Sequence, residues 1–318
     1  MALRILFFGT SEFAAPSLAR IVDEGHQVVR CVTQPDRPQG RGLRLLPSPV
    51  KLKAQALGVP VEEPETLPPM IATWQSLQPD LGVAIAYGKI LPQAVLDVPR
   101  HGMLGVHPSM LPRYRGGNPL AWAILDGLDT TGVSIFRLNA RMDAGDIALQ
   151  RAAPIHPADT TETLSSRLAD VGAQWLVEVI DQIARGTVAW QPQDEQQATI
   201  ARKFTKDDGR IDWAAPAESI ARLIRAASPW PGAYTTWHGE LLKLWAGQAT
   251  EGHDSRTGQV LHVTEERILI STGKGRLALT ELQRAGGRRL GVRDFLRGQS
   301  FQPGELLGDN RDQVRGDR

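Results

Sequence analysis

The stretch that decides the fold is His101-Gly-Met-Leu-Gly-Val-His-Pro-Ser-Met-Leu-Pro-Arg-Tyr-Arg-Gly-Gly-Asn118, in which one histidine directly follows a short apolar run. Residues 103–106 have the character of a buried strand. Pro108 and Pro112 come next, and because proline lacks a backbone N–H and fixes its own φ, no helix can form across them. The carboxyl end of a strand is where α/β proteins bind ligands. The stretch therefore predicts that His107 lies at a functional edge of a sheet.

A second stretch has the same layout. Residues 132–138, Gly-Val-Ser-Ile-Phe-Arg-Leu, are typical of a strand, and Asp143 follows them in a turn closed by Gly145. If both strands end at one edge of the same sheet, the imidazole of His107 and the carboxylate of Asp143 meet there. Each signal alone is common, since a histidine after a strand is often an ordinary surface residue and D-x-G-D is a frequent turn.

The first half of the chain alternates short apolar runs with amphipathic segments, from residue 3 to about residue 149. This alternation predicts an α/β fold with a Rossmann-like, doubly wound and mostly parallel sheet. Ser48 followed by Pro49 indicates a helix start with a capping hydroxyl. The expected strands are 5–8, 28–32, 81–86, 103–106 and 133–138, and the expected helices are 12–23, 50–57, 120–125 and 160–185.

The second half of the chain changes its pattern. Residues 187–206 are polar with repeated glutamine, which is typical of a linker. One amphipathic helix, 216–227, precedes short runs separated by turn residues, a pattern typical of a small β-barrel. The predicted domains are 1–188, a linker at 189–206, and 207–318. The expected strands of the last domain are 241–246, 259–263, 267–271 and 276–282.

Composition and missing motifs exclude several classes of protein. The 36 Lys+Arg balance 35 Asp+Glu, so bulk charge does not indicate a nucleic-acid partner and any basic surface must be local. A single cysteine, Cys31, excludes an intramolecular disulfide and a cysteine-based zinc site, and no metal is expected. Neither G-x-G-x-x-G nor G-x-x-x-x-G-K-[ST] occurs, which argues against a dinucleotide or nucleoside triphosphate cofactor. No apolar stretch reaches the roughly 18–20 residues of a membrane span, and we expect a cytoplasmic protein.

The joint pattern H-P-S-x-L-P-x-Y-R-G, T-G-V and D-A-G-D-I resembles the folate-dependent formyltransferases, and within them the members that act on methionyl-tRNA. The resemblance runs nearly end to end and stops only in about the last dozen residues. Other segments that carry it are Phe7-Phe-Gly-Thr-Ser-Glu-Phe-Ala-Ala-Pro-Ser-Leu18, Thr33-Gln-Pro-Asp-Arg-Pro-Gln-Gly-Arg-Gly42, Ala86-Tyr-Gly-Lys-Ile-Leu-Pro92, Asp208-Gly-Arg-Ile-Asp-Trp213 and Ser228-Pro-Trp-Pro-Gly-Ala-Tyr234.

The resemblance implies transfer of a formyl group from 10-formyltetrahydrofolate to the free amino group of the methionyl moiety of initiator methionyl-tRNA. It implies that 1–188 is a catalytic domain, that 207–318 is an OB-like barrel that holds tRNA, and that the protein is a monomer. His107 and Asp143 are the implied catalytic residues, and Arg41 is the implied tRNA contact. The implied folate-binding residues are Ser109, Met110, Leu111, Pro112, Ala86, Tyr87 and Gly88.

Gly105 departs from the resembled family, which has an asparagine two residues before the histidine as a donor to the oxyanion. Loss of one such donor costs roughly 2.7 to 4 kcal/mol of transition-state stabilisation. A water above Gly105 or the side chain of Asn118 are two hypothetical replacements. Two alternative functions stay open at this point: a folate-dependent formyltransferase that acts on another amine, and a tRNA-binding protein with impaired catalysis.

Overall fold

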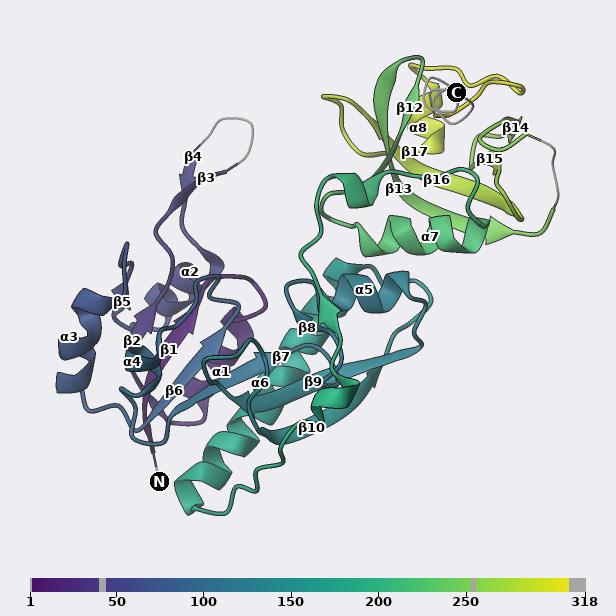
Figure 1. The fold of residues 1–318 in the computed structure, drawn as a ribbon. Coiled ribbons are helices and arrows are strands. Elements are labelled where there is room, and N and C mark those ends of the chain that lie inside the picture. Colours follow the sequence, from purple (N-terminus) through teal and green to yellow (C-terminus); the bar gives the residue numbers. More distant parts are fainter. Residues whose placement is uncertain (1, 40–43, 253–255, 309–318) are drawn as a thin grey trace, which may run out of the picture. The chain divides into compact units, whose positions relative to one another are not determined.

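The computed structural model describes residues 2–39, 44–252 and 256–308 (Figure 1). Its backbone divides into two compact units, and the chain passes between them more than once. The first unit comprises Met1–Pro119, Thr130–Pro154 and Leu164–Arg202. The second comprises Leu120–Asp129, Ile155–Thr163 and Lys203–Arg318.

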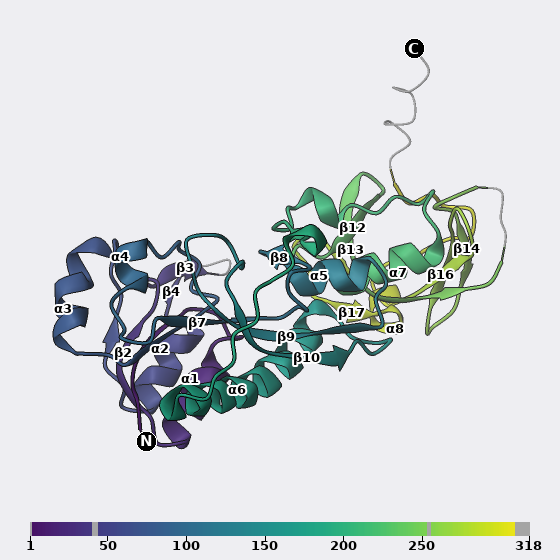
Figure 2. The same ribbon diagram turned by 60° about the horizontal axis from the view of Figure 1, so that its bottom comes forward.

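The first unit is built on one seven-stranded sheet (Figures 1 and 2). In spatial order its strands are β10 (Ile147–Pro154), β9 (Thr130–Arg137), β7 (Met103–His107), β6 (Leu81–Ile85), β1 (Arg4–Gly9), β2 (Gln27–Val32) and β5 (Val61–Glu62). The five strands from β7 to β5 are parallel, which confirms the predicted Rossmann-like, mostly parallel sheet.

The parallel strands are mainly apolar because helices cover both faces of the sheet. On one face, Phe8 packs edge-on against Trp74 of α3 (Ile71–Ser76), with 5.2 Å between ring centroids. On the other face, Gly172 of α6 (Thr161–Arg185) lies close to Val106 and Val133. The remaining helices of this unit are α1 (Ala15–Asp23), α2 (Pro49–Ala56), η1 (Pro68–Met70), α4 (Gln93–Leu96) and η2 (Glu195–Gln197).

Helix α2 begins as predicted from its sequence. The backbone N–H of Lys51 donates to the hydroxyl of Ser48 at 3.0 Å, and Pro49 occupies the first turn. The side chain of Lys51 also forms ion pairs with Asp36 and Glu63, both at 2.8 Å. Lys51 thereby fixes the chain at the root of the hairpin formed by β3 (Arg37–Gln39) and β4 (Arg44–Leu46).

Strand β9 is antiparallel to β7. The expectation that both strands end at the same edge of the sheet required them to be parallel. Leu104 pairs with Arg137 and His107 pairs with Ser134, which places the end of β9 beside the beginning of β7. Asp143 nevertheless reaches His107, because the loop between β9 and β10 turns back along the sheet. The predicted meeting of the two side chains is confirmed, whereas the expected route was wrong.

The second unit contains an antiparallel sheet in the order β12-β13-β16-β15-β14, with β17 paired to β16. These strands are β12 (Ala233–Trp237), β13 (Glu240–Thr250), β14 (Val260–Val263), β15 (Ile268–Ser271), β16 (Arg276–Arg284) and β17 (Leu290–Gly291). The helices are α5 (Pro119–Leu125), η3 (Asp207–Gly209), α7 (Ala217–Ala226) and α8 (Val292–Leu296). The sheet agrees with the predicted OB-like class, although among the described residues it is not closed, since no ladder joins β12 to β14.

Candidate active site

His107 is the last residue of β7 and is only 6% exposed. Its Nε2 lies 2.8 Å from the backbone carbonyl oxygen of Tyr114. A carbonyl oxygen can only accept a hydrogen bond, so Nε2 carries the proton and donates it. The other ring nitrogen, Nδ1, faces the carboxylate of Asp143 at 3.6 Å. Nδ1 is therefore the ring atom at which a proton can be gained or lost.

Asp143 lies in the loop between β9 and β10 and adopts a left-handed backbone conformation with φ +49°. Its Oδ2 accepts a hydrogen bond of 2.8 Å from the backbone N–H of Gly116. The carboxylate is thus held beside the imidazole without a direct hydrogen bond to it. A histidine and a carboxylate in this arrangement are suited to general acid–base chemistry.

The predicted loop 109–112 is held by hydrogen bonds to residues outside it. Ser109 is 1% exposed, and its hydroxyl donates to the carbonyl of Arg113 at 2.7 Å. The hydroxyl of Ser134 accepts from the N–H of Leu111 and donates to the carbonyl of Ser109, and Gln150 donates to the carbonyl of Leu111. The side chain of Leu111 is buried in the core. This loop, which follows shortly after His107, is therefore held to Ser134 of β9 and Gln150 of β10.

A pocket of about 320 Å³ adjoins Asp143, and its wall includes Tyr87 and Gly88. The other lining residues are Ala84, Lys89, Ile90, Leu91, Leu96, Leu138, Asn139, Ala140, Arg141 and Met142. Ala86 is not part of the lining, but both Ala86 and Gly88 adopt left-handed conformations, with φ +44° and +85°, that shape the wall.

Tyr87 contributes to the pocket wall mainly as a packed ring. Its ring lies edge-on to Phe8, with 5.5 Å between centroids, and burial raises the pKa of its hydroxyl to about 12. Its backbone carbonyl accepts hydrogen bonds from Thr10 at 2.9 Å and from Gln34 at 2.6 Å. The hydroxyl therefore stays protonated at neutral pH, and the peptide of Tyr87 is fixed from two sides.

The structure brings together four of the ten site residues predicted from sequence. His107, Asp143, Tyr87 and Gly88 lie at this edge of the first unit. The pocket lining includes none of the predicted residues 109–112 and does not include Ala86. Arg41 lies outside the described residues. Residues that sequence reasoning missed are Arg115, Gln193 and Thr199, which hydrogen-bond around the pair. Arg115 stood inside the quoted Y-R-G motif, whereas Gln193 and Thr199 lay in a segment interpreted only as a linker.

The space beside Gly105 is filled. A Cβ atom added there would lie 2.6 Å from the Phe136 ring and 2.9 Å from the side chain of Leu138. The hypothesis of a water held in that direction therefore fails for lack of room. Asn118 is partly buried.

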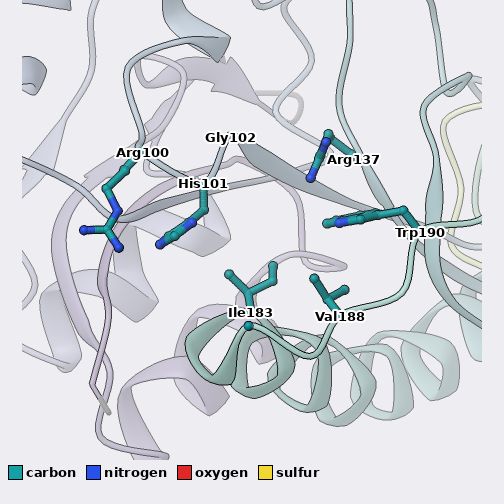
Figure 3. Close-up of a pocket in the computed structure, with 8 residues that line it drawn as sticks. Arg100, His101, Gly102, Arg137, Ile183, Val188 and Trp190 are labelled. Carbon is teal, nitrogen blue, oxygen red and sulfur yellow. The ribbon is translucent and has the colours of Figure 1, made fainter.

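A second and larger concavity of the first unit, about 450 Å³, contains none of the predicted site residues (Figure 3). His101 and Gly102, which precede β7, form one side of it, at the opposite end of the strand from His107. Arg137 stacks over Trp190 on the other side, with 4.1 Å from the guanidinium carbon to the ring centroid. The remaining lining residues are Arg100, Ile183, Gly186 and Val188.

Residues 2–39, 44–252 and 256–308 contain neither a candidate metal site nor a helix that could cross a membrane. Three or more His, Cys, Asp or Glu side chains in an arrangement that could hold a metal ion do not occur there. No helix in these ranges has the length and apolar character needed to cross a membrane.

Structural comparison supports the fold. HypX from Aquifex aeolicus, in a crystal structure with tetrahydrofolic acid, superimposes with a TM-score of 0.67 at 20% identity over 98% of this chain, which spans 51% of that longer protein. The N-formyltransferase from Helicobacter canadensis, in complex with folinic acid and dTDP-3-aminofucose, gives a TM-score of 0.67 at 17% identity, covering 89% of this chain and 100% of that one.

Sequence comparison identifies the family. Residues 3–180 match the family described as formyl transferase, and residues 203–300 match the formyl transferase C-terminal domain. The curated methionyl-tRNA formyltransferase from Citrifermentans bemidjiense is 43% identical over 96% of this chain and 96% of its own length. The one from Roseiflexus sp. strain RS-1 is 46% identical over 97% of this chain and 96% of its own length. The chain belongs to the formyl transferase family, alongside its methionyl-tRNA formyltransferases.

Proposed function

We propose that this chain transfers the formyl group of 10-formyltetrahydrofolate to the amino group of the methionyl moiety of initiator methionyl-tRNA. The observation that carries the proposal is the placement of His107 Nδ1 against Asp143, beside a pocket of about 320 Å³. The full-length likeness to curated methionyl-tRNA formyltransferases, which includes the C-terminal domain, supports the choice of acceptor.

The reaction needs a path for one proton. The amine nitrogen attacks the formyl carbon, the carbonyl becomes an oxyanion, the bond from carbon to N10 of the folate breaks, and the proton lost by the amine ends on N10. His107 donates from Nδ1 to the oxyanion, since Nε2 is already engaged by Tyr114. Asp143 stabilises the protonated imidazole and, through water, carries the proton of the attacking amine.

The donor is proposed to occupy the pocket lined by Tyr87 and Gly88, with Ala86 and loop 109–112 supporting its wall. The pocket lining is mainly apolar and also contains the polar side chains of Asn139, Arg141 and Asp143, which suits a planar ring with hydrogen-bonding edges. Arg41 is proposed to contact the tRNA, because a guanidinium forms bidentate hydrogen bonds with phosphate. We further propose that the protein acts as a monomer in the cytoplasm.

Single-turnover formylation tests this function. The assay compares methionyl initiator tRNA with a free amino sugar nucleotide as acceptor, using 10-formyltetrahydrofolate as donor. We expect turnover on the charged tRNA, and a loss of about a hundredfold to ten-thousandfold in His107→Ala. His101→Ala is the matched control, because that histidine lines the other concavity, and it should retain full activity. Formylation of the small amine alone, or an unchanged rate in His107→Ala, would refute the proposal.

A further inference from the structure

We propose that residues 190–201, here called the return segment, position the catalytic pair, with Gln193 holding Asp143 and Thr199 holding the peptide that orients His107. The proposal rests on the proposed function for the roles of the pair. The return segment belongs to the first unit, as do all the residues that it contacts below.

Gln193 clamps the loop that carries Asp143. Its side-chain Nε2 donates to the backbone carbonyls of Asp143 at 2.9 Å and of Gly145 at 2.7 Å. Asp143 has a left-handed backbone, a conformation that a non-glycine residue keeps only when its surroundings enforce it. One amide group that binds two carbonyls of the same turn provides such enforcement.

Arg115 fixes the orientation of Gln193. The guanidinium is buried, and its Nε and Nη2 donate to Oε1 of Gln193 at 3.1 and 2.7 Å. The same guanidinium forms two hydrogen bonds of 3.0 Å to Glu195, and the bond from Arg115 lowers the pKa of that carboxyl. Because the oxygen of Gln193 faces a guanidinium, its nitrogen must face the carbonyls of the Asp143 turn.

Thr199 acts on the other side of the imidazole. Its hydroxyl accepts a hydrogen bond of 2.8 Å from the backbone N–H of Tyr114, the residue whose carbonyl accepts from His107 Nε2. Tyr114 is also left-handed, with φ +57°. Backbone bonds from the N–H of Arg115 to the carbonyl of Thr199, and from the N–H of Thr199 to the carbonyl of Pro112, anchor the contact. Thr199 therefore holds the backbone on both sides of Tyr114: its hydroxyl binds the preceding peptide, and its carbonyl binds the peptide whose oxygen accepts from His107.

The start of the segment is anchored separately. Trp190 lies under the guanidinium of Arg137, as Figure 3 shows, and Gln191 exchanges two backbone hydrogen bonds with Ile147, at 2.8 and 2.9 Å. These contacts fasten the segment at both ends of the Asp143 loop, so Gln193 is presented from a fixed backbone.

The catalytic pair depends on these supports because its members are 3.6 Å apart, which is too long for a direct hydrogen bond. Each side chain is held by its own loop. The two loops are joined directly by the bond from the Gly116 N–H to Asp143, and the return segment binds both of them as well. A displacement of about 1 Å in such a site costs about a hundredfold in rate. Gln193 and Thr199 are thus positioning residues, without contact to the reacting atoms.

The test uses substitutions that preserve size. Gln193→Glu keeps the oxygen that accepts from Arg115 but loses the N–H donor to the carbonyls of Asp143 and Gly145. Thr199→Val removes the hydroxyl that binds the Tyr114 N–H, and Thr199→Ser keeps it. We expect kcat for formylation to fall about tenfold to a hundredfold in Gln193→Glu and Thr199→Val, with KM for both substrates within about threefold of wild type. Thr199→Ser should restore most of kcat. Gln196→Glu is the control, since this exposed neighbour in the same segment makes no side-chain contact with the site.

Two readouts separate positioning from mere structural support. In an Asp143→Asn background, Gln193→Glu should cause little further loss, because both changes act through one group. A wild-type kcat in Gln193→Glu would overturn the proposal. So would a lowered melting temperature together with losses of kcat that add up when Gln193→Glu and Asp143→Asn are combined. If the wild type does not formylate methionyl-tRNA, the proposed function fails. In that case nitrogen NMR of the His107 ring still tests the positioning role. The proposal requires one imidazole tautomer in the wild type and a mixture of both tautomers in Thr199→Val.

Discussion

The ring of Phe136 occupies the direction in which a side chain at Gly105 would extend. The two residues pair across β7 and β9, and an added Cβ would lie 2.6 Å from Cε1 of the ring and 2.8 Å from its Cζ. Protein interiors are too closely packed for such an overlap to be absorbed without displacement. A side chain at position 105 therefore requires Phe136 and Leu138 to move from the positions they occupy in this chain.

Gly105→Asn is expected to destabilise the protein and to lower activity. The new side chain collides with Phe136 and Leu138 from its first atom, and overpacking of a core costs about 1–3 kcal/mol of unfolding free energy. Urea unfolding and formylation rates measure the two effects. Gly298→Ala is the control, because a Cβ there meets nothing within 4 Å. A stable Gly105→Asn with raised activity would instead support the alternative that the glycine impairs catalysis.

Asp143→Asn is expected to reduce kcat about a hundredfold or more while the protein stays folded. The amide keeps the shape of the carboxylate and can still accept from the Gly116 N–H, but it cannot stabilise a protonated His107. Single-turnover rates with saturating donor measure the loss. Retention of more than about a third of the wild-type rate would remove Asp143 from the catalytic pair.

Gly88→Ala is expected to raise KM for the folate donor. Its φ of +85° costs a non-glycine residue about 1–2 kcal/mol, and the added Cβ collides with the amide of Gln34, which binds the carbonyl of Tyr87. Gly58→Ala is the matched control, since its φ of +67° carries a similar backbone cost with nothing within 4 Å. A larger KM for the donor in Gly88→Ala, with an unchanged KM in Gly58→Ala, would support this turn as part of the donor site. An unchanged KM in both variants would contradict it.

His26 is expected to make stability depend on pH. Burial lowers its pKa below the ordinary value of 6.5, and its Nδ1 accepts a hydrogen bond of 3.2 Å from the backbone N–H of Leu3. A depressed folded-state pKa contributes stability above pH 6.5, and this contribution is lost as pH falls through the folded-state value. Urea unfolding from pH 7.5 to 5 should show this loss in wild type, and His26→Gln should show a smaller slope. The same change of stability with pH in wild type and His26→Gln would contradict the role of His26.

The sequence determined the features that depend on neighbouring residues. Continuous apolar runs specify parallel strands buried on both faces, as in Phe7 and Phe8 of β1. Ser48 and Pro49 specify the start of α2 through a local hydrogen bond. The shift to short runs with turns specifies the antiparallel second unit. The motif around His107 placed the histidine at the end of its strand, because proline ends the strand there.

Only the tertiary structure decided the arrangement of the site. The antiparallel direction of β9 follows from pairing with β7, which local periodicity does not record, and it changes the route by which Asp143 reaches His107. The contact between Arg115 and Gln193 joins residues 78 positions apart. Both the filled space at Gly105 and the anchoring of the return segment arise from packing and hydrogen bonds between residues distant in sequence, and such contacts exist only once the chain has folded.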